Sequence, residues 1–408
     1  MTERIQSLDA LRGFSLLGIL LLNIVSFGLP FSAYMNPTVY GGATGLNFAA
    51  WLVAMTLWDG KMRAIFSLLF AASADLLLSR VSAAFYYRRS AWLILIGLLH
   101  AHLIWSGDIL YPYGVIGLLL YPLRRLSARQ LIILGVVIIV LHSAWNFGGS
   151  LAMRDMEKTG GADWNQIQTM FNPSEAQVNE QIRIHRGGYL DNLRLRSSEA
   201  FMFEVPMFFQ FLFLDILGMF VLGLGLARAG IFNASRSVRF YTVITIVGFA
   251  LGIPLNYWAT TQWANSGFKI PEYFQYVAVT ADPGRLLVAA GYIGIVMLLA
   301  KAGIDWIIRP LAAVGRMALS NYLLTSILLT LFFNGYGLGY FARLERAQLY
   351  WVVLAMWAIN LTISPLWLRH FQYGPAEWLW RSLTYWQLQP FRRTNALSNP
   401  SPSEPNPA

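Results

Sequence analysis

The stretch LIGLLHAHLIWSGDILYPYGVIGLLLYPL, residues 95–123, decides the fold class of this chain. It is almost entirely apolar and is longer than the roughly 20 residues that an α-helix needs to cross a bilayer. A Ser-Gly-Asp turn at 106–108 divides it, which predicts two helices joined by a tight connection. Similar apolar runs occur along the whole chain, so we predict an all-α, polytopic transmembrane helical bundle.

The composition of the chain agrees with a membrane protein. Of its 408 residues, 56% are hydrophobic and only 12% are charged, about half the charged fraction of a typical soluble domain. The absence of cysteine excludes disulfides, thiolate nucleophiles and Cys-ligated zinc sites.

The apolar runs predict about ten membrane spans. A further apolar segment, 46–59, is predicted to be a helix on or dipping into the membrane interface, because joining it to the next run would give an over-long span interrupted by Gly60. The predicted spans are 12–30, 62–80, 89–105, 109–124, 129–146, 200–227, 240–258, 285–303, 314–334 and 349–368.

These spans divide the chain into four regions. We expect an N-terminal transmembrane region at 1–146 and an extracytoplasmic loop with short helices at 147–199. A second transmembrane region follows at 200–390, and the tail at 391–408 is predicted to be disordered. The tail is rich in Pro, Ser and Asn, a composition that cannot bury a core.

The basic residues predict the orientation of the bundle. With a cytoplasmic N-terminus, well over half of the 30 Lys and Arg residues fall on the inner side, whereas the outer segments 31–46 and 106–108 contain none. Both termini are therefore predicted to be cytoplasmic. Most of the net charge of +10 then reflects topology, so the predicted partner is the lipid bilayer and not nucleic acid.

Two histidines and a carboxylate interrupt the apolar stretch quoted above. Ionisable groups inside a membrane are costly, and this makes His100 and Asp108 candidates for a functional site. His102 faces nearly the opposite side of the helix from His100, so the two do not chelate one ion, and we predict no metal site. Simpler roles stay open: Asp108 as a helix cap and His100 in a hydrogen bond between helices.

A second charged segment, LWDGKMRAIFSLLF, lies at the same predicted depth. Its carboxylate, Asp59, is predicted to share one outer-leaflet pocket with His100 and Asp108. The alternative is that the Lys and Arg of this segment extend their charges to the interface, and that the Asn of the first span only bonds two helices. The predicted substrate-binding residues of the pocket are Asn23, Lys61, Arg63, Trp105 and Tyr113.

A third polar set lies at the predicted inner side of the membrane. Topology alone favours arginine there, but arginine also offers paired donors to phosphate. We therefore predict a phosphate-binding mouth formed by Arg12, Arg316, Asn321 and Arg369.

Several motifs occur in order along the chain: LDALRGFSLLGILLLNI, GLLHAHLIWSGDILYPYGVIGLL, DILGMFVLGLGLARAGI, GRMALSNYLLTSIL and WLRHFQYGPAEWLWRSLTY. Together they resemble the YeiB-like family of bacterial inner-membrane proteins, which carries domain of unknown function 418. The likeness runs from about residue 5 to 386 and implies a multi-pass protein of the bacterial inner (plasma) membrane.

The N-terminal part is also similar, more weakly, to the catalytic region of heparan-α-glucosaminide N-acetyltransferase and to the wider group of transmembrane acyltransferases. This similarity implies transfer of an acyl group from a cytosolic acyl-CoA donor to an extracytoplasmic sugar or other hydroxyl or amine acceptor. The chain departs from that group at Asn23, where many members have His. It also has no His between 24 and 61.

The residues and the resemblance together predict an acyltransferase. His100 would be the general base, because an imidazole pKa of about 6.5 suits proton abstraction at neutral pH. Asp59 or Asp108 would orient its ring, and Lys61 or Arg63 would stabilise the developing oxyanion. The alternatives are a secondary transporter of a small solute, which needs a similar pocket, and a scaffolding membrane protein.

Overall fold

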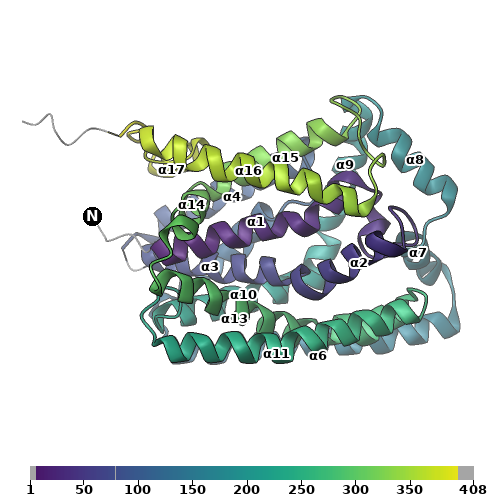
Figure 1. Cartoon of the computed structure of the whole chain (residues 1–408), viewed down its shortest axis with the longest axis horizontal. Helices are drawn as coiled ribbons and strands as arrows, with labels where there is room; N and C mark the ends of the chain where they lie inside the picture. Colours follow the sequence, from purple (N-terminus) through teal and green to yellow (C-terminus); the bar gives the residue numbers. More distant parts are fainter. Residues whose placement is uncertain (1–5, 79, 394–408) are drawn as a thin grey trace, which may run out of the picture.

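A computed structural model describes residues 6–78 and 80–393 as a bundle of helices (Figure 1). Within these residues every regular element is helical, apart from one isolated bridge between Phe371 and Arg392. The all-α prediction is therefore confirmed. Most of the tail predicted to be disordered, residues 394–408, lies outside the described part.

Six helical segments of the described chain are long and apolar enough to cross a membrane. A seventh arises if α14 (Asp305–Arg316) and α15 (Ala318–Phe333), which meet at 80°, form one broken span. Several apolar helices thus indicate a membrane protein, while the multi-pass topology and the count of ten spans stay predictions. The six segments are Gln6–Gly28 (α1), Ala128–Thr159 (α6), Tyr189–Arg228 (α9 to α10), Val238–Asn265 (α11), Ile270–Lys301 (α12 to α13) and Arg346–His370 (α16).

The expected span at 109–124 is wrong as a single crossing helix. In its place the chain forms α5 (Leu110–Leu118), a turn, and a 3₁₀ turn at Pro122–Arg125. Nine helical residues reach only about 14 Å, half of the roughly 30 Å hydrocarbon core. Most of α5 is buried against α4 (Ala83–Leu103), and at Gly97 of α4 a Cβ would lie only 2.3 Å from the backbone of the α5 residue Tyr111.

Helix α6 extends beyond its predicted end at residue 146 and continues to Thr159. Its buried side continues at helical spacing through His142, Asn146, Ser150 and Met153, which explains why the helix does not stop where the polar sequence begins. Short helices follow, as expected for this loop, although its predicted limits at 147 and 199 both fall inside continuous helices. The short helices are α7 (Ala162–Phe171), α8 (Glu175–His185) and α9 (Tyr189–Glu204).

The apolar segment 46–59 is helical, as predicted. It forms α2 (Gly45–Val53) and a π-helical turn at Ala54–Trp58, and it is separated from α3 (Lys61–Leu78) by Gly60. The backbone of Gly60 has a φ of 70°, a left-handed conformation that favours glycine and lets the chain turn between the two helices.

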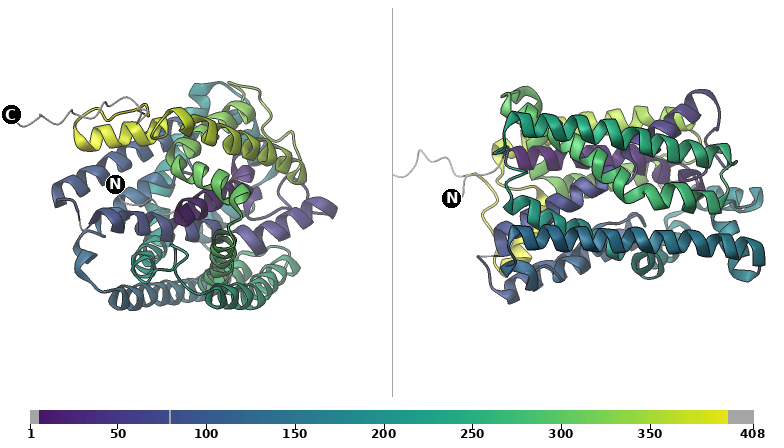
Figure 2. Two further views of the ribbon diagram at one scale, coloured as in Figure 1. Left: turned by 60° about the vertical axis from the view of Figure 1, so that its left-hand side comes forward. Right: turned by 90° about the horizontal axis from the view of Figure 1, so that it is seen from below.

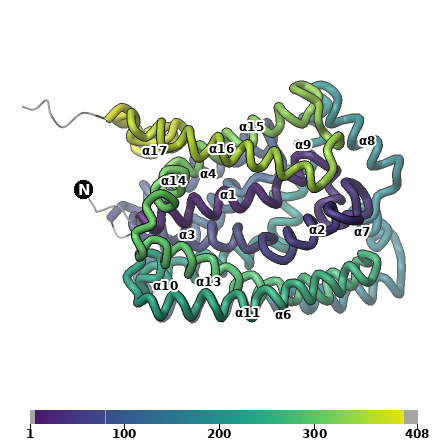
Figure 3. Tube along the Cα trace, in the orientation of Figure 1, coloured from purple at the N-terminus to yellow at the C-terminus, as the bar shows by residue number. Residues whose placement is uncertain are grey.

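Helix α1 runs through the middle of the bundle, with α3 and α16 on either side (Figures 1 and 3). The start of α1 and α17 (Pro375–Tyr385) lie at one end of the molecule, and α2, α7 and α8 lie at the other (Figure 1). Figure 2 shows from below that the long helices run along the axis joining these two ends. Alignment of long apolar helices along one axis is typical of a bundle that crosses a membrane.

Two glycines allow α1 and α14 to touch through their backbones. A Cβ added to Gly13 would lie 1.9 Å from the carbonyl oxygen of Leu311, and one added to Gly315 would lie 1.9 Å from that of Asp9. Because the obstacles are backbone atoms, a larger residue can be accommodated only if the helices separate.

We predict that Gly13→Ala destabilises the protein by about 1–3 kcal/mol, the usual cost of overpacking a tight core. Thermal unfolding of the purified protein, followed by tryptophan fluorescence, measures the change. Gly148→Ala in α6 is the matched control, because its Cβ would meet no atom within 4 Å. The control should keep or raise stability, since alanine favours a helix over glycine; equal losses in both variants would contradict the role of this crossing.

Candidate functional site

A cavity of about 750 Å³ opens among the helices toward the end where α2, α7 and α8 lie. Its wall includes the second half of α1, the start of α3 and parts of α6, α10, α13 and α15. Of the residues predicted from the sequence, five line this cavity, and they are Asn23, Asp59, Lys61, Arg63 and Trp105.

His100 and Asp108 form a buried pair at the end of α4. The Nδ1 atom of His100 lies 2.8 Å from Oδ1 of Asp108, and both side chains are at most 2% exposed. The second carboxylate oxygen of Asp108 accepts a hydrogen bond of 2.7 Å from the backbone N–H of Tyr111. Asp108 therefore caps the start of α5 and also orients the imidazole. The capping role that the sequence left open for Asp108 thus does not exclude its contact with His100.

The predicted pocket shared by His100 and the charged segment of α3 needs a correction. His100 and Asp108 do not line the cavity. The rings of Trp105 and Tyr322 do line it, and they lie 6.4 Å and 5.0 Å from the His100 ring. Trp105 is held in place by stacking on Phe27, at 4.1 Å between ring centroids. The imidazole therefore lies behind an aromatic wall.

Asp59 and Lys61, the first two charged residues of the segment 57–70, each form a hydrogen bond with a neutral group at the turn before α3. Asp59 accepts a hydrogen bond of 2.9 Å from the hydroxyl of Tyr34, so in this structure it does not orient His100. Lys61 is buried and donates to the backbone carbonyl of Met55 at 2.8 Å, which rules out the alternative in which Lys61 extends to the interface. Both contacts instead fix the turn between α2 and α3 at the cavity wall.

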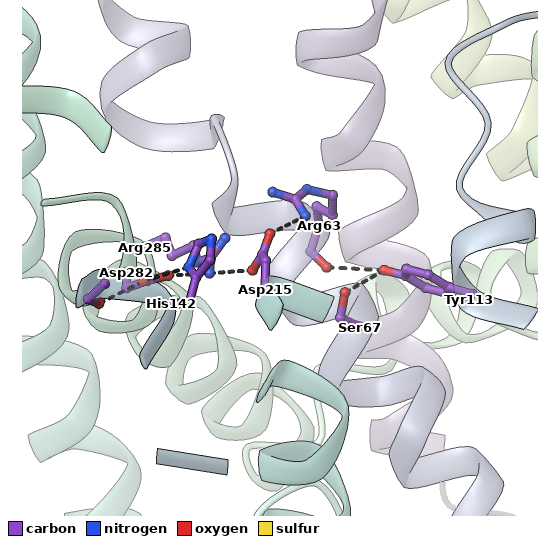
Figure 4. Close-up of polar contacts among 8 residues, drawn as sticks. Arg63, Ser67, Tyr113, His142, Asp215, Asp282 and Arg285 are labelled. Carbon is purple, nitrogen blue, oxygen red and sulfur yellow. Dashed lines mark hydrogen bonds and ion pairs between the residues drawn. The ribbon is translucent and has the colours of Figure 1, made fainter. Parts of the chain in front are cut away.

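Arg63 belongs to a chain of charged side chains, otherwise buried, that the sequence analysis missed (Figure 4). Its guanidinium lies 2.5 Å from Asp215 of α10 (Phe213–Arg228). Arg285 of α13 (Val279–Lys301) contacts both Asp215 and Asp282, and Asp282 in turn lies 2.8 Å from Nδ1 of His142 on α6. We call Arg63, Asp215, Arg285, Asp282 and His142 the charged network.

No spacing rule could have found this network, because its members come from four helices distant in the sequence. The available signal was weaker: each of Asp215, Asp282 and His142 is an ionisable residue within an otherwise apolar run, and such residues are functional candidates inside a membrane.

Three members of the network offer a geometry that could hold a metal ion. One ligand atom each of His142, Asp215 and Asp282 lies within 4.8 Å of the others. The contacts of Arg285 with both carboxylates place a positive charge where a cation would bind. The arrangement therefore favours an ion-pair network, and the absence of a metal site stays a prediction.

Tyr113, predicted to bind substrate, is buried and does not line the cavity. Its hydroxyl lies 2.5 Å from Oγ of Ser67, and it bonds the backbone carbonyl of Arg63 at 3.4 Å (Figure 4). It therefore links α5 to α3 and holds the backbone of α3 at Arg63.

A smaller pocket of about 340 Å³ lies at the opposite end of the bundle. Two of the four predicted phosphate-binding residues, Arg316 and Arg369, line it together, and Arg309 and Arg393 complete what we call the basic pocket. Asp9 also lies in its wall, so the pocket is positive but not purely so.

The other two predicted phosphate-binding residues, Arg12 and Asn321, do not line the basic pocket and make structural contacts. Arg12 bonds Asp9 at 2.8 Å and the backbone carbonyl of Gly315 at 3.3 Å, which ties α1 to α14. Asn321 is buried and donates to the carbonyl of Val314 at 3.1 Å and to Oγ of Ser364 at 2.9 Å. These contacts hold the side chains of Arg12 and Asn321 against other groups of the protein, so neither is positioned to bind a ligand in the basic pocket.

We predict that Arg285→Met destabilises the protein by about 3–5 kcal/mol, because it leaves two buried carboxylates short of a cation. Chemical or thermal unfolding in detergent measures the loss. Arg309→Met is the control: Arg309 pairs with Asp305 at the surface, with side chains 72% and 51% exposed, and such pairs contribute about 0–1 kcal/mol. Similar losses in the two variants would refute the importance of the network.

Comparison with known proteins matches the predicted family over nearly the whole chain. The model of a family described as a protein of unknown function (DUF418) matches residues 226–387. The uncharacterized protein YeiB of Escherichia coli (strain K12) is 31% identical over 392 residues, which cover 94% of this chain and 96% of that protein. The uncharacterized protein YxaH of Bacillus subtilis (strain 168) is 28% identical, with 96% of each chain covered. The chain therefore belongs to the YeiB-like, DUF418 family.

Proposed function

We propose that this protein is an integral membrane acyltransferase, which moves an acyl group from a cytosolic acyl-CoA to a hydroxyl or amine acceptor, such as a sugar, on the far side of the membrane. The observation that supports this most is the His100–Asp108 pair beside the cavity. The bond between Nδ1 and Asp108 favours the tautomer that carries its proton on Nδ1. The other nitrogen, Nε2, then has a lone pair able to accept a proton.

The Nε2 atom of His100 is buried and has no hydrogen-bond partner among the described residues. Leaving such a group unsatisfied costs about 1–3 kcal/mol, and this calls for an explanation. A role as general base supplies one. Nε2 would take the proton of the acceptor hydroxyl as its oxygen attacks the thioester carbonyl; the C–S bond would then break, and the proton would pass to the departing CoA thiolate.

An acceptor in the cavity would reach Nε2 only if the aromatic wall opens. Trp105 and Tyr322 stand between the cavity and His100, and Tyr322 accepts a hydrogen bond of 3.3 Å from the backbone N–H of Ile109. The proposal therefore includes displacement of one of these rings when the acceptor binds. Such a step would also exclude water from the reacting thioester.

The basic pocket is the proposed site for the donor phosphates, because guanidinium groups form charge-assisted hydrogen bonds with phosphate. Helix α1 borders both sites: Gln6 and Asp9 lie at the basic pocket, and Asn23 and Phe27 lie at the cavity. At 1.5 Å per residue, Asp9 and Asn23 are about 21 Å apart along the helix. The acyl arm of the donor would have to extend along α1 to meet the acceptor.

This proposal requires the basic pocket to face the cytosol and the cavity to face outward, in a bacterial inner membrane with both termini cytoplasmic. The distribution of Lys and Arg supports that orientation. The start of α1 and α17 lie at the same end of the bundle, which agrees with both termini on one side of the membrane but is equally compatible with either orientation.

We predict that Lys158→Cys, at the exposed end of α6, reacts with a membrane-impermeant thiol reagent in intact cells. Ala302→Cys, exposed just after α13 at the other end, should react only after the cells are permeabilised. Because the chain has no cysteine, each variant carries a single label site. The opposite labelling pattern would invert the orientation and refute the assignment of donor and acceptor sides.

We predict that Arg316→Ala or Arg369→Ala weakens acetyl-CoA binding roughly ten- to a hundredfold, because each charge-assisted contact contributes about 1.5–3 kcal/mol. His100→Ala should keep donor affinity and lose transfer, because a general base acts on the acceptor. Calorimetry measures binding, and release of free CoA in the presence of acceptor amines or sugars measures transfer.

Two controls separate these effects from general damage. Arg125→Ala removes an exposed arginine that does not line the basic pocket. His102→Ala removes the other histidine of α4, which bonds Glu204 at 3.2 Å and is partly exposed. Both should behave as wild type; full transfer by His100→Ala would refute the proposed base.

A secondary transporter is the second candidate, and the charged network supports it. Buried ion pairs that border a cavity within a membrane bundle are typical of solute and proton pathways. Failure of the wild-type protein to bind any acyl-CoA would favour this candidate over acyl transfer.

A further inference from the structure

The charged network is electrically balanced as long as His142 is neutral. Arg63 and Arg285 carry two positive charges, and Asp215 and Asp282 carry two negative charges. In a low-dielectric environment any added charge is costly unless a second charge compensates it. The network therefore constrains which ligands the cavity can bind.

Arg63 presents unused hydrogen-bond donors to the cavity. Its guanidinium has five N–H groups, of which one bonds Asp215 through Nη1. The side chain is 31% exposed and the residue lines the cavity, whereas Arg285 is 5% exposed and is enclosed by two carboxylates. Arg63 is thus the member of the network placed to bind an anion.

His142 is the member placed to take up a proton. Its Nδ1 contacts Asp282, whose Oδ2 also accepts a hydrogen bond of 2.7 Å from Ser143, and His142 lines the cavity. No hydrogen bond from the described residues reaches its other nitrogen. A proton there would give an imidazolium paired with a buried carboxylate.

The groups packed around His142 leave it as the titrating member. Charged side chains lie near it on α10 and α13, and all belong to the network; α6 also packs against the π-helical segment Tyr273–Ala278, which carries the phenols of Tyr273 and Tyr276. Helices α7 and α12 pack on α6 near Met153, about 16 Å further along. The other histidine at the cavity, His185, stays neutral because burial against Phe341 lowers its pKa to about 4.

We propose that the cavity binds a singly charged carboxylate at Arg63 and that His142 takes up one proton with it. The carboxylate adds one negative charge, and the imidazolium restores the balance. A doubly charged phosphate would leave one charge uncompensated, so the network selects a monoanion. The planar guanidinium also matches the two oxygens of a carboxylate. This inference does not rest on acyl transfer, since the carboxylate could belong to an acceptor or to a transported solute.

Benzoate and benzamide test the proposal, because they have nearly the same shape and differ in charge. We expect benzoate to bind the purified full-length protein at least tenfold more tightly than benzamide. Calorimetric titration with benzoate in two buffers of different ionisation enthalpy measures proton uptake from the difference between the two heats of binding. It should show uptake of about one proton per benzoate. Above the pH at which His142 loses its proton, benzoate affinity should fall about tenfold per pH unit. Equal binding of both probes, no binding of benzoate or no proton uptake would overturn the proposal.

Variants test separately the anion binding proposed for Arg63 and the proton uptake proposed for His142. His142→Gln keeps a polar group beside Asp282 but cannot be charged, so benzoate binding should be weak, independent of pH and free of proton uptake. The double variant Arg63→Gln with Asp215→Asn removes one charge of each sign and should abolish benzoate binding while the network stays balanced. His102→Gln, outside the network, should retain the wild-type pH dependence. Size-exclusion profiles identify any variant that fails to fold, and proton counting on the wild type tests the proposal without variants.

Discussion

The contacts of Arg285 with Asp215 and Asp282 are the interaction on which the interior of this bundle depends. One guanidinium joins α10 to α13, and the two carboxylates extend the connection to Arg63 on α3 and His142 on α6. Away from water these charges are stable only together, because removal of any one leaves the remaining charges unbalanced. The cavity is therefore bordered by helices whose relative positions are set by charge pairing as well as by apolar packing.

Much of the fold could be predicted from local sequence, and the errors have physical causes. Helix α1 (Gln6–Gly28) was predicted as the span 12–30 because its apolar run is long, and the polar residues at its start hid its true beginning. The end of α6 was misplaced because a polar sequence was taken as a loop, although Asn146 and Ser150 continue its buried side. The short α5 was predicted as a full span because hydropathy measures apolarity and does not distinguish burial in protein from burial in lipid.

The candidate sites also include features that the sequence could predict and features that it could not. The pairing of His100 with Asp108 was accessible because only eight residues and one tight turn separate them. The common pocket of Arg316 and Arg369 was accessible from topology, since both were expected at the inner face. The charged network was not accessible, because its pairs join residues up to 152 positions apart, as in Arg63 and Asp215. Nor could sequence indicate that the rings of Trp105 and Tyr322 screen His100 from the cavity.

The backbone contact between α1 and α14 has a mechanical consequence. At Gly13 and Gly315 the two helices touch with no side chain between them that could change rotamer and let one helix slide past the other. The two helices should therefore move as a single rigid body, and it carries Arg309 and Arg316 together with the α1 side of the cavity. Any gating motion would then have its hinge at the 80° bend between α14 and α15 or among the helices beyond the cavity, not at the α1–α14 crossing.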